Sequence, residues 1–152
     1  MNALEREQRD RVETAALSWI GTPYHNHARV KGANGGVDCA NLLAMVYIEA
    51  DVIEPFDIEN YPPQFFLHSS EERFMARVLE HSHEVDEADA KCGDVVLYKI
   101  GLCYAHGAII VSPGWPFAII HAHAMSRCVL RSGGRDAELG RSLRHPRFFS
   151  RW

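Results

Sequence analysis

The stretch that decides the fold covers residues 35–50 and reads GGVDCANLLAMVYIEA. A glycine pair, whose backbone can take angles that other residues avoid, precedes a run that is apolar nearly all round. This pattern predicts a turn that leads into a helix buried on most of its faces. Cys39 lies in the first turn of that helix, where unpaired amides and the helix dipole favour a thiolate and can hold an oxyanion. We therefore expect Cys39 to be a nucleophile with a lowered pKa.

A cysteine nucleophile needs a base, and histidines in the second half of the chain are the candidates. His106 lies near the start of an apolar run, between an alanine and a glycine that leave room around its ring. In the next apolar run, His121 could meet His106 across a sheet and orient it. Strand alternation points His123 to the same face, so it stays open as the alternative to His121. The pattern predicts Cys39 as the nucleophile, His106 as the base and His121 as the orienting group.

Two more helices are expected in the first half of the chain. Apolar residues recur at helical spacing from near Leu4 up to a break at residues 21–23, which read Gly-Thr-Pro. Ser69 followed by Glu72 is typical of a capping box, and the helix that it begins is expected to end near His81. These helices flank the buried helix that carries the cysteine.

The second half of the chain changes to short apolar or alternating runs, which predict strands. The runs cover residues 95–98, 104–111, 117–123 and 128–130, with turn residues between them. Short connections of this kind favour an antiparallel meander. Helices first and strands second predict an α+β fold in which the N-terminal helices pack on one face of an antiparallel sheet. Residues 1–152 are expected to form a single domain.

The order of five short motifs resembles the NlpC/P60 family of papain-like cysteine peptidases. The resemblance covers nearly the whole chain and rests on Gly21-Thr22-Pro23-Tyr24, Asp38-Cys39, Gly93-Asp94-Val95-Val96-Leu97, His106-Gly107-Ala108-Ile109 and Ile120-His121-Ala122. Within the family, the chain is most similar to the tail-assembly peptidases of phages and prophages, through residues 61–68, 71–74 and 147–150. The resemblance implies a papain-like fold with the catalytic cysteine at the N-terminus of a buried helix.

The resemblance also implies a catalytic triad of Cys39, His106 and His121, with the hydroxyl of Tyr24 beside the oxyanion. The implied substrates are the peptide stems of bacterial peptidoglycan, cleaved between γ-linked D-glutamate and a diamino acid. Relatives that need a free N-terminus on the stem bind that amine with an acid before the cysteine, and Asp38 is the matching position. The Asp38 side chain is equally suited to cap the helix, and both roles could hold at once. Phage tail proteins are further partners that the resemblance suggests, and it implies no cofactor.

The residues after the cysteine depart from the family pattern. Many relatives have Ser-Gly where this chain has Ala40 and Asn41, so a substrate contact from a serine hydroxyl is missing. An amidase or acyltransferase that acts on a non-murein substrate therefore stays open as an alternative. A tail subunit that kept the fold and lost the reaction is the other alternative. The proline that often precedes Gly-Asp is Cys92 here, a change that we expect to be structurally neutral.

Composition and charge exclude several classes of partner. The chain has 152 residues, a formal net charge of -4 and a pI near 6.1, so it lacks the net basic face that phosphate binding needs. Nucleic acid is therefore not expected as a partner. The first residues are densely charged where a secretory leader would be apolar, and no apolar run approaches the length of a membrane span. We expect a protein of the cytoplasm or of a phage tail that makes no membrane contact.

The cysteine and histidine patterns bear on disulfides and metals. The four cysteines show neither CxxC spacing nor the density of a disulfide scaffold, which suits a reducing compartment. His-x-His pairs at residues 25–27, 81–83 and 121–123 could each place two imidazoles on one zinc ion. A thiolate at a helix end explains the site without a metal, so we expect none.

Overall fold

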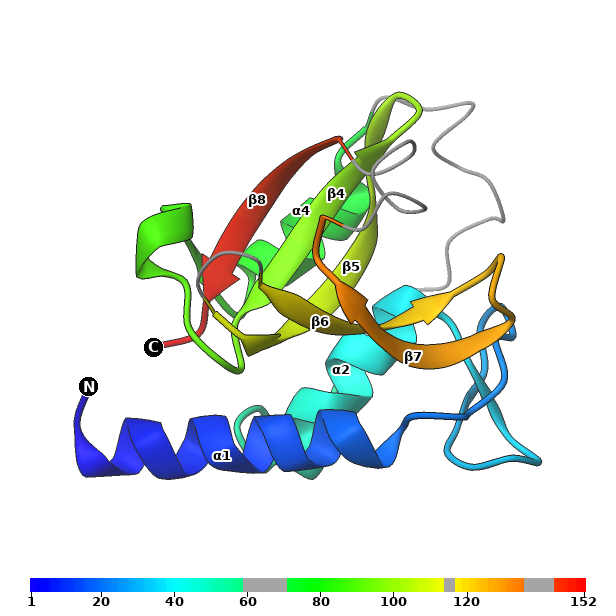
Figure 1. The fold of residues 1–152 in the computed structure, drawn as a ribbon, viewed down its shortest axis with the longest axis horizontal. Coiled ribbons are helices and arrows are strands. Elements are labelled where there is room, and N and C mark those ends of the chain that lie inside the picture. Colours follow the sequence, from blue (N-terminus) through cyan, green and yellow to red (C-terminus); the bar gives the residue numbers. More distant parts are fainter. Residues whose placement is uncertain (59–70, 114–116, 136–143) are drawn as a thin grey trace.

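The long helices come first along the chain and lie together on one side of a sheet (Figure 1). The computed structural model describes residues 1–58, 71–113, 117–135 and 144–152. Its helices are α1 (Ala3–Ser18), α2 (Cys39–Glu49) and α4 (Arg73–Leu79), with a short 3-10 helix, η1 (Glu87–Asp89). α1 and α2 confirm the first two helices expected from the sequence. Within the described ranges, no helix is both long and apolar enough to cross a membrane.

The main sheet has six antiparallel strands in the order β3-β8-β4-β5-β6-β7. The strands are β3 (His83–Val85), β4 (Val95–Ile100), β5 (Cys103–Ser112), β6 (Ala118–His123), β7 (Cys128–Gly133) and β8 (Arg144–Ser150). A separate two-stranded sheet, formed by β1 (Arg29–Val30) and β2 (Gly36–Val37), precedes α2. The four strands predicted from the sequence are confirmed as an antiparallel meander, β4 to β7.

The sequence does not predict β3 and β8. β8 returns from the end of the chain to pair with β4, with Phe149 opposite Val95 and Phe148 opposite Val96. β3 pairs with β8 and forms an edge of the sheet. β3 has only three residues, two of them exposed, so it lacks the apolar alternation that marks a strand in a sequence. Both strands form because of partners that are distant along the chain.

Two apolar clusters lie on opposite faces of the sheet, because successive strand residues point to opposite sides. The larger cluster joins the sheet to the helices and includes Trp19, Leu42, Leu97, Ile109 and Ile120. The smaller cluster includes Val96, Tyr98, Ile110, Ile119 and Phe148. α2 is the central helix, since it lies between α1 and strands β5 and β6 (Figure 1). The expected packing of helices on one face of an antiparallel sheet is confirmed.

The start of α4 differs from the expectation. The helix begins at Arg73 with Glu72 in the N-cap position, and the Glu72 side chain makes no capping hydrogen bond. Instead, this carboxylate accepts a hydrogen bond from the backbone amide of Tyr104 at 2.9 Å, which ties the helix start to β5. The predicted capping role of Glu72 is therefore wrong, and Ser69 lies outside the described residues.

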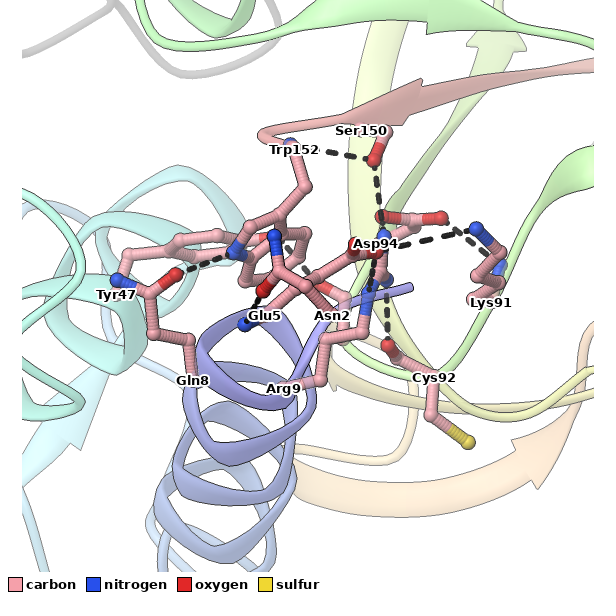
Figure 2. A network of polar contacts seen from close by, with 11 residues as sticks. Asn2, Glu5, Gln8, Arg9, Tyr47, Lys91, Cys92, Asp94, Ser150 and Trp152 are labelled. Carbon is pink, nitrogen blue, oxygen red and sulfur yellow. Dashed lines mark hydrogen bonds and ion pairs between the residues drawn. The ribbon is translucent and has the colours of Figure 1, made fainter.

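A buried arginine ties α1 to the sheet and to the end of the chain (Figure 2). The Arg9 side chain is 5% exposed, and its Nη1 lies 2.9 Å from Oδ1 of Asp94, which is 1% exposed. The guanidinium also donates to the carbonyl of Cys92 at 2.8 Å and to Oγ of Ser150 at 3.2 Å. It lies 4.0 Å from the ring centroid of Trp152. One side chain thus holds together segments from both ends and the middle of the chain.

The substitution Arg9→Met is expected to lower the free energy of unfolding by about 3–5 kcal/mol, because it leaves the Asp94 carboxylate buried without its charge partner. Chemical denaturation followed by circular dichroism measures this change. Arg6→Met, at an exposed position of the same helix, is the control and should change the stability by less than about 0.5 kcal/mol. Equal stabilities for the two variants would contradict the role given to Arg9.

Candidate active site

The N-terminus of α2 carries the predicted nucleophile. Asp38 is the N-cap residue, and its Oδ1 accepts a hydrogen bond from the backbone amide of Asn41 at 2.8 Å. Cys39 is the first residue of the helix. Leu42 and Val46 are fully buried, so the core fixes the position of the first turn. Cys39 begins a buried helix, as the sequence predicts, and its catalytic role stays a prediction.

The start of β5 supplies backbone groups around the Cys39 sulfur. Ile110 exchanges backbone hydrogen bonds with the residues just before β4. Peptide groups alternate in direction along a strand, so those of Ile109, Gly107 and Ala105 point to the other side, toward β6. Pairing of β5 with β6 begins at Ile109. Nearer the start of β5, Cys39 contacts this side of the strand, and its Sγ lies 3.7 Å from the carbonyl oxygen of Ala105.

Gly107 allows α2 to approach β5 closely. A Cβ at this position would lie 2.7 Å from Cδ1 of Leu43, 2.9 Å from Cζ of Phe74 and 3.0 Å from Cδ2 of Leu97. A larger residue would therefore force these side-chain ends to shift. The glycine after His106 thus allows the close approach between the cysteine helix and the strand that carries His106.

Hydrogen bonds join three side chains from neighbouring strands. Nε2 of His106 on β5 lies 2.8 Å from Nδ1 of His121 on β6. Nε2 of His121 lies 2.8 Å from Oγ of Ser132 on β7. His106 is 7% exposed and His121 is fully buried, whereas Nδ1 of His123 lies 2.7 Å from Oγ of Ser126 at the surface. The structure brings His106 together with His121, and it adds Ser132, which the sequence pattern does not indicate.

The environment of the Cys39 thiol differs from the sequence expectation. The residue keeps partial exposure, and all four cysteines of the chain are free thiols. Burial first, and then the Asp38 carboxylate, raise the pKa of Cys39 to about 12, although the backbone amides of Gly107, Ala40 and Cys39 itself lower it. The expected lowering of this pKa is therefore wrong. The amides act in the expected direction, but burial and a neighbouring negative charge outweigh them.

Burial also keeps the two histidines neutral at pH 7. Burial first, and then His121 and His123, hold the pKa of His106 well below its usual value of 6.5. Burial and then His123 lower the pKa of His121 to about 3. Both rings therefore carry one proton each, and each can donate one hydrogen bond and accept one.

Tyr24 lies within electrostatic reach of the thiol. An isolated parallel bridge joins Tyr24 to Val37, two residues before Cys39. Burial first, and then Cys39 and Asp38, raise the pKa of Tyr24. Its hydroxyl donates to Oδ1 of Asn26 at 3.4 Å. The phenol thus stays protonated at neutral pH and can act as a hydrogen-bond donor.

Asn41, one of the departures from the family pattern, fills acceptor positions of Asp38. Its Nδ2 lies 2.9 Å from each oxygen of the Asp38 carboxylate, and Oδ2 also accepts from the backbone amide of His27 at 2.6 Å. Oδ1 of Asn41 accepts from Nε of Arg29 at 2.7 Å. The capping role of Asp38 is confirmed, and its role in substrate binding stays a prediction. Arg29 carries no sequence motif, so only the unusual Asn41 signals a polar partner here.

An apolar cavity lies between α2 and α4, apart from the histidine chain, by which we mean the hydrogen-bonded side chains of His106, His121 and Ser132. Its lining includes Ala40, Leu43 and Phe74, together with Arg77 and Arg151. In the part of the chain that the structure describes, no group of three or more His, Cys, Asp or Glu residues could hold a metal ion. The predicted catalytic residues Cys39, His106 and His121 lie at the N-terminus of α2, on β5 and on β6.

Neither a protein-family model nor a curated protein sequence matches the chain, whereas solved structures of NlpC/P60 domains share its fold. The peptidoglycan hydrolase RipB of Mycobacterium tuberculosis superposes with a TM-score of 0.63 and 20% identity, over 99% of this chain and 68% of RipB. The P60 domain of an antigen from M. avium subspecies paratuberculosis superposes with a TM-score of 0.64 and 17% identity, over 98% of both chains. The expected NlpC/P60 fold is confirmed.

A further similar structure is that of RipD from M. tuberculosis, a non-catalytic NlpC/p60 domain protein adapted to peptidoglycan binding. It superposes with a TM-score of 0.58 and 17% identity, over 94% of this chain and 96% of RipD. Proteins with this fold therefore include both a hydrolase and a protein without catalytic activity.

The raised pKa predicts slow, pH-dependent alkylation of Cys39. Because the thiolate is the reactive form, the rate of modification by iodoacetamide should rise about tenfold per pH unit from pH 7 to pH 9. Peptide mapping by mass spectrometry separates Cys39 from the other cysteines. Asp38→Asn removes a charge that raises the pKa and keeps a capping oxygen, so it should speed the reaction at pH 8. A plateau below pH 8 would mean that the thiolate is already formed.

Proposed function

We propose that this chain, which has the fold of the NlpC/P60 domains, is a cysteine peptidase that hydrolyses amide bonds in the peptide stems of bacterial peptidoglycan. The observation that carries the proposal is the hydrogen-bonded pair of His106 and His121, together with the Cys39 thiol, which lies against the carbonyl of Ala105, the residue before His106. A nucleophile, a base and a group that orients the base are what acyl transfer needs. The similarity to a peptidoglycan hydrolase supports the substrate class.

The first step is attack by the Cys39 sulfur on the carbonyl carbon of the scissile amide. Nδ1 of His106 takes the thiol proton as the sulfur–carbon bond forms, because Nε2 of the ring is engaged by His121. Proton transfer accompanies the attack, since burial raises the pKa of Cys39 and lowers that of His106, which disfavours a resting ion pair. The Cys39 amide and the Tyr24 hydroxyl donate to the oxyanion.

The second half of the reaction releases both products. The carbon–nitrogen bond breaks as the His106 imidazolium protonates the leaving amine, which leaves a thioester on Cys39. Water then gives a proton to His106 and adds to the thioester carbonyl. The carbon–sulfur bond breaks, the carboxylic acid leaves, and the thiol regains its proton. His121 stabilises the imidazolium at each stage by accepting from its Nε2–H.

The finer assignments belong to the same proposal. We place the cleavage between γ-linked D-glutamate and a diamino acid, the bond that the sequence resemblance implies. Asp38 would bind the free amine of such a stem by exchanging a hydrogen bond from Asn41 or His27, since these donors already reach both carboxylate oxygens. Association with a phage tail rests on the sequence resemblance alone. Residues 61–68 of this chain, which carry part of that resemblance, lie outside the described ranges.

A second candidate function is peptidoglycan binding without cleavage. The similarity to RipD favours it, and so does the raised pKa of Cys39, which makes the thiol a poor nucleophile at rest. In that case, the histidine pair would serve only to satisfy buried polar groups. An amidase or acyltransferase with a non-murein substrate remains the third possibility, because of Ala40 and Asn41.

Digestion of purified sacculi and muropeptides, followed by mass spectrometry, tests the proposal. The wild-type protein should release a product cleaved at the D-glutamyl to diamino-acid bond. Cys39→Ala and His106→Ala should abolish this product, with circular dichroism showing an unchanged fold. His121→Ala should leave measurable turnover, because the base remains and only its orientation is lost.

Three other outcomes would change the assignment. Full activity of Cys39→Ala would overturn the proposed nucleophile. A wild-type protein that co-sediments with sacculi and yields no product would favour the binding domain. Absence of both binding and product would point to a non-murein substrate.

A further inference from the structure

The reaction steps described above make no use of the hydrogen bond between His121 and Ser132. It joins Nε2 of His121 to Oγ of Ser132 at 2.8 Å. Ser132 lies on β7, two residues beyond Leu130, the direct cross-strand partner of His121. Side chains at this diagonal spacing share one face of a sheet. The hydroxyl therefore reaches the imidazole on the side of the ring opposite to His106.

Counting the protons on His106, His121 and Ser132 shows which atom must donate each hydrogen bond and which must accept it. A neutral imidazole has one N–H and one lone pair. For His106 to take the thiol proton at Nδ1, this atom must hold the lone pair and Nε2 must carry the hydrogen. Nδ1 of His121 accepts that hydrogen, so the hydrogen of the second ring lies on Nε2. The group placed to accept it is the hydroxyl of Ser132.

The requirement is stricter once His106 is protonated. An imidazolium has two N–H groups, so Nε2 of His106 can only donate to Nδ1 of His121. His121 is fully buried in the intact protein, and the hydroxyl of the half-buried Ser132 is the hydrogen-bond partner that the described residues offer its Nε2. A serine hydroxyl both donates and accepts, so it can turn its lone pair to this N–H. Losing the acceptor would destabilise the protonated state of His106.

We propose that Ser132 is a positioning residue of the active site, which accepts the hydrogen bond from Nε2–H of His121 and so holds both histidines in the tautomers that let His106 act as the base. Its catalytic consequence rests on the proposed function, whereas its effect on the tautomers does not. In the opposite arrangement, Nδ1–H of His121 donates to Nε2 of His106. The His106 proton then lies on Nδ1, where it blocks uptake of the proton from Cys39.

Two-bond ¹H–¹⁵N NMR correlation spectra of the histidine rings test the tautomers directly. In the wild-type protein, both His106 and His121 should carry their proton on Nε2. Ser132→Ala should shift the His121 signals toward the Nδ1–H form, and Ser132→Thr, which keeps a hydroxyl and suits a strand, should restore them. A wild-type His121 protonated on Nδ1, or tautomers that Ser132→Ala leaves unchanged, would overturn the proposal.

Ser126→Ala is the matched control. It removes the equivalent serine–histidine hydrogen bond from His123, which lies outside the chain from His106 to Ser132. It should leave the tautomers of His106 and His121 unchanged, and circular dichroism checks the fold of every variant. A change in the His106 and His121 tautomers as large as that in Ser132→Ala would overturn the special role of Ser132.

Kinetics give a second readout where the wild-type protein turns over stem peptides. Ser132→Ala should lower kcat by about 10- to 100-fold with little change in KM, because the lost hydrogen bond acts on the base and not on substrate binding. Ser132→Thr should recover most of this loss. A wild-type kcat in Ser132→Ala would overturn the proposal. A wild-type protein without turnover would overturn the proposed function, and the NMR spectra would still decide the role of Ser132.

Discussion

The close approach of α2 to β5 at Gly107 is the constraint on which the rest of the site depends. A Cβ at this position would lie within 3.0 Å of side-chain atoms of Leu43, Phe74 and Leu97, so glycine is the residue that fits without a shift of these side chains. The approach places Cys39 against the backbone of Ala105, where β6 no longer pairs with β5. His106 and His121 lie just beyond this pairing, and their rings meet there. The position of α2, the start of β5 and the hydrogen-bonded histidines therefore depend on one packing arrangement.

This packing has opposite effects on the two kinds of group in the site. Burial disfavours charge, so it raises the pKa of the Cys39 thiol and lowers the pKa of both histidines. Burial also strengthens hydrogen bonds between neutral groups, and it makes an unpaired N–H costly. The thiol and the two imidazoles are thus neutral at rest, and hydrogen bonds hold the two imidazoles in place. Charge would develop only during the reaction, where the amides of the α2 N-terminus and the Tyr24 hydroxyl lie close by.

The fold could be predicted from the sequence where local patterns determine structure. The glycine turn before Cys39, the apolar helix and the alternating runs of the meander are all local signals. β8 could not be predicted, because it forms through pairing with distant β4. Cys39, His106 and His121 stand out because their side chains carry chemistry, whereas Ser132 is an ordinary strand serine until its partner is placed. The predicted lowering of the Cys39 pKa is wrong, because the sequence shows that the thiol lies at a helix end and does not show that it is buried.

The most direct test of the central claim, that Cys39 and the histidine chain act as one acyl-transfer unit, is covalent trapping by a stem-peptide chloromethyl ketone followed by intact mass spectrometry. The account predicts a single adduct, which peptide mapping places on Cys39, and labelling at least about 100-fold slower in His106→Ala. Labelling at another cysteine, or a rate at Cys39 that does not depend on His106, would contradict it.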